Sequence, residues 1–247
     1  MVENTKILLL FIFLVFSTSL SYGADKAADS KDKDSGTIPN YGIVGSARLT
    51  SNFIDRGLSY SDGHTAFNAA FLMHLGSQFK FGIWGSNISN LTSSEDNLWV
   101  KYVGQVFIDF QQNSKMIFYV HDDHFYKSDL RNGQRFGFKV DYSRFTGLYE
   151  YNNNYEGTRA SSSYINVKFT KKYSDKIGLD LGLGYTFQNS NTYNDYADIS
   201  AIAFYKPTAT FRTEIGLTMP SNTTQFGSRS SLGYFIALNM NSDQQSQ

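Results

Sequence analysis

The sequence predicts an all-β protein, a transmembrane antiparallel up-and-down β-barrel of about twelve strands. Three observations predict it. Apolar and polar residues alternate after residue 40, the connecting segments alternate in length, and the chain is rich in aromatic residues but poor in charged ones. The chain has 247 residues, zero net charge, no cysteine, 16% aromatic residues and 18% charged residues. About 25% charged residues is usual in soluble domains. The lack of cysteine excludes disulfides and thiolate metal sites, and the balanced charge argues against a nucleic-acid partner.

The N-terminal 23 residues predict a cleavable signal peptide. Residues 7–16 form an unbroken apolar run that Lys6 precedes, and the small residues Ser21 and Gly23 stand before a cut near Ala24. The run is shorter than the roughly 20 residues of a transmembrane helix, although an uncleaved anchor is the alternative. Residues 24–37 mix charges without large apolar side chains, so we assign residues 24–39 to a disordered periplasmic linker.

Alternation from residue 40 onward marks strands with one apolar and one polar face. The clearest example runs from Ile177 to Phe187, where Leu, Tyr and Phe alternate with Gly, Asp and Thr. Most segments have the length of about 9–11 residues that a tilted transmembrane strand needs. We place the barrel at residues 40–240 and a polar C-terminal tail at residues 241–247. The predicted strands lie near 40–52, 65–75, 78–88, 96–110, 114–121, 134–142, 145–151, 161–172, 176–188, 197–205, 208–219 and 229–240.

The connections alternate between short and long, which is typical of outer-membrane barrels with tight periplasmic turns and longer outer loops. Both chain ends then lie on the side of the short turns. A soluble lipocalin-like barrel is the alternative, and it would turn its apolar face inward and carry a more charged surface. The expected long loops are residues 53–64, 89–95, 122–133, 152–160, 189–196 and 220–228.

The last predicted strand carries a possible assembly signal. Residues Ser231–Leu238 follow a polar-x-Gly-x-x-apolar-x-apolar pattern, which resembles the signal that the barrel assembly machinery reads in outer-membrane proteins. Such proteins usually end on an aromatic residue, whereas a polar tail follows here. We expect the barrel assembly machinery to be a partner that either reads this signal internally or assembles the barrel less efficiently because of the tail.

A set of mostly polar residues marks the N-terminal part of the predicted barrel. Its members are Ser51, Asn52, Arg56, Gly57, Ser59, Ser61, Asp62, Trp84, Ser86 and Asn87. This set resembles the TorF family of proteobacterial porins over roughly residues 40–105. The sequence departs from the family at Asn52, where Asp is usual, and at Asp55, where an aromatic residue is usual. The resemblance implies an outer-membrane channel.

The part of this set around Arg56 and Gly57 falls in the first long loop, which suggests a constriction. An inward-folded loop would oppose Arg56 to Asp55 and Asp62, and such opposed charges tune ion and solute selectivity. The alternative is that Arg56 pairs locally with these carboxylates, or with Asn52, and only fixes the shape of the loop.

The remaining charges fall on the polar face and are predicted to line the lumen. Both signs are mixed, which predicts weak ion selectivity, although paired charges in a narrow lumen could equally form a plug. With Asp55, Arg56 and Asp62, the pore and constriction candidates are Arg48, Lys80, Lys101, Asp109, Arg135, Lys139, Asp141, Arg212 and Glu214.

One cluster has metal-ligand chemistry, the run His121-Asp122-Asp123-His124, which is expected to open the third long loop. Strand geometry would put His121 and Asp123 on one face, but no third ligand and no serine partner can be named. We therefore predict no enzyme activity, no metal and no cofactor. The predicted function is a monomeric, weakly selective outer-membrane channel for small solutes or ions, in contact with outer-membrane lipids. The alternatives are a non-conducting structural or surface-recognition barrel, and an outer-membrane hydrolase that uses these histidines.

Overall fold

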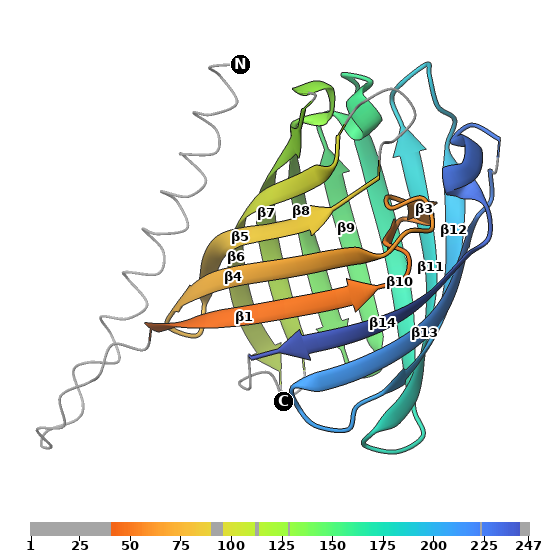
Figure 1. The fold of residues 1–247 in the computed structure, drawn as a ribbon. Helices are drawn as coiled ribbons and strands as arrows, with labels where there is room; N and C mark the ends of the chain where they lie inside the picture. Colours follow the sequence, from red (N-terminus) through yellow and green to blue (C-terminus); the bar gives the residue numbers. More distant parts are fainter. Residues whose placement is uncertain (1–40, 90–95, 112–113, 128, 223, 243–247) are drawn as a thin grey trace, which may run out of the picture. The chain divides into compact units, whose positions relative to one another are not determined.

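The alternating segments build twelve long strands that close into one antiparallel barrel (Figure 1). The computed structural model describes residues 41–89, 96–111, 114–127, 129–222 and 224–242. The predicted signal peptide, the linker and residues 243–247 of the tail lie outside these ranges. The strands are β1 (Tyr41–Thr50), β4 (Ala66–Leu75), β5 (Phe79–Asn87), β6 (Leu98–Gln111), β7 (Ser114–Tyr126), β8 (Gly133–Tyr142), β9 (Phe145–Asn152), β10 (Ser162–Lys172), β11 (Ile177–Gln188), β12 (Tyr196–Tyr205), β13 (Phe211–Pro220) and β14 (Gly233–Asn241).

Each strand of the barrel pairs with its neighbours along the chain, and β1 pairs with β14 to close the ring. In this seam Ser46 lies opposite Asn241 and Thr50 lies opposite Ala237. Closure leaves no exposed sheet edge, which a structure surrounded by lipid requires. The predicted fold class and strand number are confirmed.

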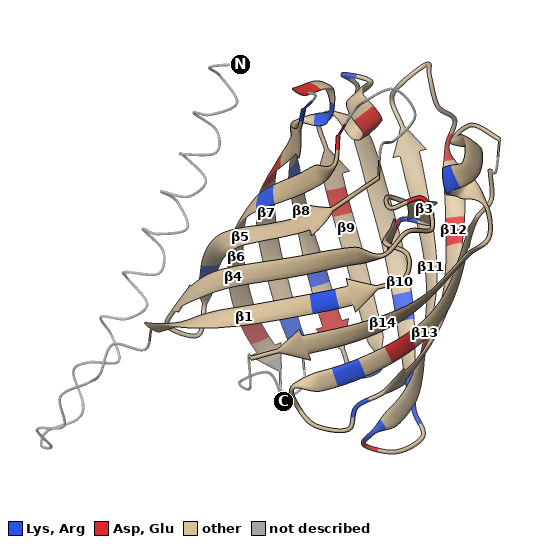
Figure 2. Cartoon of the chain, viewed as in Figure 1, with Lys and Arg blue, Asp and Glu red and all other residues tan. Residues whose placement is uncertain are grey.

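The outer surface of the barrel is apolar. Ile43, Phe71, Leu183 and Ile215 each expose 60% or more of their surface. Many inward positions carry polar or charged side chains, such as Asn68, Arg135, Glu150 and Asp180. Figure 2 shows acidic and basic positions mixed along the strands. A lipocalin-like barrel would turn these apolar side chains inward, so that alternative is wrong.

The connections alternate between short and long as predicted, with one difference. Short turns join β4 to β5 and β8 to β9, whereas residues 51–65 and 221–232 form long connections at the opposite end. Strand β7 extends to Tyr126, beyond the predicted end at residue 121, so residues 122–126 belong to the wall. The extension is stable because Tyr126 pairs with Leu98 of β6 and Asp123 pairs with Gly133 of β8.

The long-loop end of the interior is packed with apolar side chains. This aromatic cluster consists of Leu58, Tyr60, Ile88, Trp99, Phe125, Tyr155, Tyr196 and Phe226, with Phe53, Trp84 and Tyr193 packed against it. The described residues include three 3-10 helices, η1 (Asp129–Arg131), η2 (Tyr155–Gly157) and η3 (Gly227–Ser230). None of the helices in the described ranges is long and apolar enough to cross a membrane.

Candidate functional site in the barrel interior

The first long loop folds into the barrel as a small hairpin. Its strands are β2 (Ile54–Asp55) and β3 (Leu58–Ser59), and Arg56 and Gly57 form the tip with φ of 50° and 77°. A Cβ on Gly57 would lie 2.9 Å from the Cβ of Asp198 and 3.3 Å from that of Pro220. The tip therefore abuts the β12–β13 wall, at a position where both the backbone angle and the space call for glycine.

Polar motif residues fix the base of the hairpin. The Oδ1 atom of Asn52 accepts hydrogen bonds from the hydroxyls of Ser59 (2.6 Å) and Ser61 (3.2 Å). The backbone N–H of Phe53 donates to Ser61 Oγ at 2.8 Å. The expected contact between Asn52 and Arg56 is therefore wrong, because the amide is already engaged by serine hydroxyls of its own loop.

Arg56 pairs with a residue of the barrel wall that lies far from it in the sequence. Its guanidinium forms a buried ion pair with Glu150 of β9 and lies over the rings of Tyr155 and Tyr164, 5.3 and 4.7 Å from their centroids. The carboxylate of Glu150 also accepts from Tyr119 at 2.8 Å. Arg56 thus has a long-range partner, so the hypothesis that local carboxylates serve it is wrong.

The two local carboxylates make other contacts. Asp55 lies 3.4 Å from Arg135 of β8, and Asp62 accepts a hydrogen bond from Ser228 at 3.0 Å. Arg135 connects the hairpin to the two strands that flank β8, because it also pairs with Asp123 of β7 and lies 3.1 Å from Glu150 of β9. Charges of both signs therefore lie at the same level as the hairpin tip.

Outer loops are joined by a second buried cluster around Glu156 of η2. Its carboxylate accepts from Arg229 at 2.8 and 3.2 Å, pairs with Arg131 at 3.2 Å and accepts from the hydroxyl of Tyr60. Burial opposes ionisation, yet Arg229 and Arg131 hold the pKa of Glu156 well below its usual range. Burial and the nearby Glu156 carboxylate raise the pKa of Tyr60. This loop clasp holds the hairpin to the loops before β10 and β14.

Among the predicted lumen charges, Arg48, Arg212 and Glu214 form one network. Arg48 lies 3.0 Å from Glu214, which lies 2.6 Å from Arg212, and Arg212 also pairs with Asp180 at 2.8 Å.

The other lumen candidates lie on β5 to β8. Lys139 pairs with Asp141 at 2.8 Å, and Lys101 lies between Trp84 and Trp99, 4.4 and 4.1 Å from the ring centroids. Two further candidates follow the same inward register: Lys80 lies over the ring of Phe107, and Asp109 pairs in register with Lys115.

The histidine run does not open a loop but lies within β7. Residues 121–123 pair with both β6 and β8, and His124 pairs with Val100 of β6. Asp123 is inward and accepts from Trp99 Nε1 at 3.2 Å, and His121 faces the same side. Asp122 and His124 face outward and lie 3.0 Å apart. Within the described ranges, no group of three His, Cys, Asp or Glu side chains is placed to hold a metal ion.

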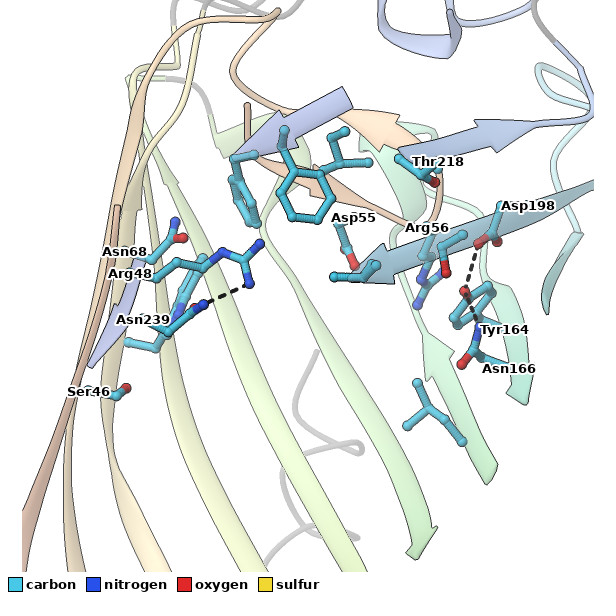
Figure 3. A pocket seen from close by; sticks show the side chains of 18 of the residues that line it. Ser46, Arg48, Asp55, Arg56, Asn68, Tyr164, Asn166, Asp198, Thr218 and Asn239 are labelled. Carbon is cyan, nitrogen blue, oxygen red and sulfur yellow. Dashed lines mark hydrogen bonds between the residues drawn. The ribbon is translucent and has the colours of Figure 1, made fainter. Parts of the chain in front are cut away.

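A cavity of about 590 Å³ lies against the hairpin inside the barrel. Figure 3 shows Arg48, Asn68 and Asn239 on one side and Tyr164, Asn166 and Asp198 on another, with Asp55 and Arg56 of the hairpin between them. Asn68 and Asn166 lie at strand positions that the alternation assigns to the inner face, so the sequence could have identified them as lumen residues. Sequence reasoning missed the loop clasp, because Glu156, Arg131 and Arg229 come from three separate loops.

Comparisons with known proteins identify the fold. No family model matches the sequence, and no curated protein matches it. A solved KdgM porin is 8% identical with a TM-score of 0.51, over 80% of this chain and 97% of that chain. A NanC porin is 7% identical with a TM-score of 0.53, over 80% of this chain and 98% of that chain. The chain is therefore similar in fold to these porins.

Proposed function

We propose that this protein is a porin-like channel of the bacterial outer membrane, through which small solutes or ions diffuse passively with weak selectivity. The observation that carries the proposal is a closed barrel with an apolar outer face and a polar inner face that borders a cavity of about 590 Å³. An apolar outer band around a polar interior is the arrangement of outer-membrane barrels. The similarity in fold to KdgM and NanC porins supports the same proposal.

The inward hairpin is the proposed constriction of this channel. Its tip is held to β9 by Arg56 and Glu150, and Asp55 is held to β8 by Arg135. Because cations and carboxylates meet at one level, neither sign of ion is strongly favoured there. The packed aromatic cluster occupies part of the interior at the loop end, so a low conductance is expected.

The remaining sequence predictions complete this proposal. Residues 1–23 would export the chain, the barrel assembly machinery would read Ser231–Leu238, and the barrel would reside in outer-membrane lipid as a monomer. Membership of the TorF family is part of the proposal. It rests on the resemblance of residues 51–62 and 84–87 to the residues that mark that family.

A non-conducting structural barrel is the second candidate, and the aromatic cluster that fills the loop end favours it. Liposome swelling separates the two. Protein-loaded liposomes diluted into an isotonic solution of a small neutral sugar should swell at a rate proportional to the amount of folded protein. Swelling no faster than that of protein-free liposomes would contradict the channel and favour the structural barrel.

A further inference from the structure

The hairpin borders two cavities of the barrel interior. The inner cavity is the one of about 590 Å³, and its lining reaches toward the short-turn end at the exposed residues Ser46 and Asn241. The outer cavity, of about 320 Å³, lies at the long-loop end, where the exposed residue Asp62 borders it. Ile54 and Gly57 line both cavities. The two cavities therefore adjoin each other at the hairpin.

The side of the hairpin that faces β5 and β6 is packed. The ring centroid of Phe53 lies 5.9 Å from that of Trp84 and 6.0 Å from that of Trp99. Ion pairs join the hairpin to β8 and β9. Both cavities instead reach the wall of β13 and β14, where Thr218 borders the inner cavity and Gly233 borders the outer one. Solutes therefore have more room on the β13–β14 side of the hairpin.

Ile54 lies between the hairpin and this wall. Side chains alternate along a strand, so Ile54 faces away from the side to which its neighbours Phe53 and Asp55 point. A Cβ on Gly233 would lie 2.6 Å from Ile54 Cδ1 and 3.3 Å from Thr218 Cγ2. The Ile54 side chain thus lies directly on the backbone of β14, beside Thr218, in the space that a side chain at position 233 would take.

We propose that the solute path runs along this side of the hairpin, from the outer to the inner cavity, and that Ile54 is the apolar gate between them. The inference rests on the proposed channel and identifies the residue that limits flow through it. Polar residues line both cavities, among them Ser59 and Asp62 in the outer one and Asn68 and Asn166 in the inner one. An apolar constriction between two wet cavities resists wetting, so it hinders the passage of water and ions.

Planar-bilayer recording of two substitutions at this position tests the gate. Ile54→Ala shortens the side chain that lies on β14, and it should raise the single-channel conductance about twofold or more. Ile54→Trp should lower the conductance, because its larger ring extends into the outer cavity and fills the path. Opposite effects of the two variants distinguish a gate from a general loosening of the barrel. A gel shift on heating shows that each variant is folded.

Leu58→Ala is the matched control, because Leu58 is another apolar residue of the hairpin, paired in register with Asp55, but lines neither of these two cavities. It should change the conductance much less than Ile54→Ala does. An equal rise in both variants would overturn the gate, because loosening of the hairpin would then explain the effect. Wild-type conductance in both Ile54→Ala and Ile54→Trp would also overturn it.

The same recordings separate the gate from the proposed channel. A conducting wild type with no effect of either Ile54 substitution contradicts the gate and leaves the channel standing. Steps in Ile54→Ala but none in the wild type support the gate and contradict an open channel in the wild type. Folded protein without steps in the wild type and in Ile54→Ala contradicts both proposals.

Discussion

At the residue scale, Arg56 is the side chain on which the proposed constriction depends most. Its partner Glu150 keeps contacts with Arg135 and Tyr119 when the arginine is removed. Breaking a buried ion pair costs about 3–5 kcal/mol, and these remaining contacts place the expected loss toward the lower end. Arg56 is therefore both a structural partner and a fixed charge in the lumen.

Arg56→Ala should lower the thermal stability of the folded barrel and raise its conductance, because the hairpin tip loses its tie to β9. Gel shift after heating measures the first effect, and planar-bilayer recording measures the second. Arg159→Ala is the matched control, since Arg159 also has a positive φ (61°) but is exposed. Unchanged conductance in Arg56→Ala would leave the residue a purely structural role.

Gly57 offers a steric test of the packing between the hairpin tip and β12. Gly57→Ala should push the hairpin tip away from Asp198, since the new Cβ would lie 2.9 Å from the Cβ of Asp198. We expect a larger conductance and a lower unfolding temperature. Gly63→Ala places the same methyl group at a similar φ of 76° with no atom within 4 Å. If both variants behave alike, backbone strain rather than contact with the wall explains the effect.

The loop clasp predicts a pH dependence. The pKa of Glu156 is depressed in the folded state, so its contribution to stability is present above its unfolded value, near 4.5, and is lost as pH falls below it. Thermal unfolding of the wild type should therefore show a falling midpoint below about pH 4.5. Glu156→Gln should be less stable at pH 7 and show a weaker dependence. An unchanged pH profile in Glu156→Gln would contradict this role, and the exposed Asp129→Asn serves as the control.

At the element scale, strands were predictable and their partners in the lumen were not. Period-two alternation identifies the strands because one face meets water and the other does not. The predicted end of β7 is too early, because the four consecutive acidic or histidine residues 121–124 are typical of a solvated loop. In the barrel, Asp123 is satisfied by Arg135 of the next strand, which sequence alone does not reveal.

The two faces of β12 give a matched pair of substitutions. Ile199 faces outward and is 50% exposed, whereas the adjacent Ser200 borders the cavity. Ile199→Arg should destabilise the barrel in lipid vesicles by about 2–4 kcal/mol if this face meets the middle of the bilayer. Ser200→Arg should be tolerated better, because its side chain reaches the polar interior. Urea unfolding in vesicles measures both, and equal losses would argue against a lipid-facing surface.

At the scale of the whole molecule, the barrel combines a sealed wall with a partly filled interior. The hairpin and the aromatic cluster occupy the loop end, and the cavity lies beside the hairpin. An inward path of the first loop was one of the two hypotheses that its charged motif offered. Its tie to Glu150, 94 residues further along the chain, could not be expected, because only barrel closure brings β9 opposite the hairpin.

Planar-bilayer recording of the purified wild-type barrel tests the channel most directly. We expect discrete, low-conductance steps whose reversal potential stays close to zero across a KCl gradient, because both signs of charge meet at the hairpin. Folded, heat-modifiable protein that gives no steps in any lipid would contradict the channel. Steps with a reversal potential near that of a pure cation or anion channel would contradict weak selectivity.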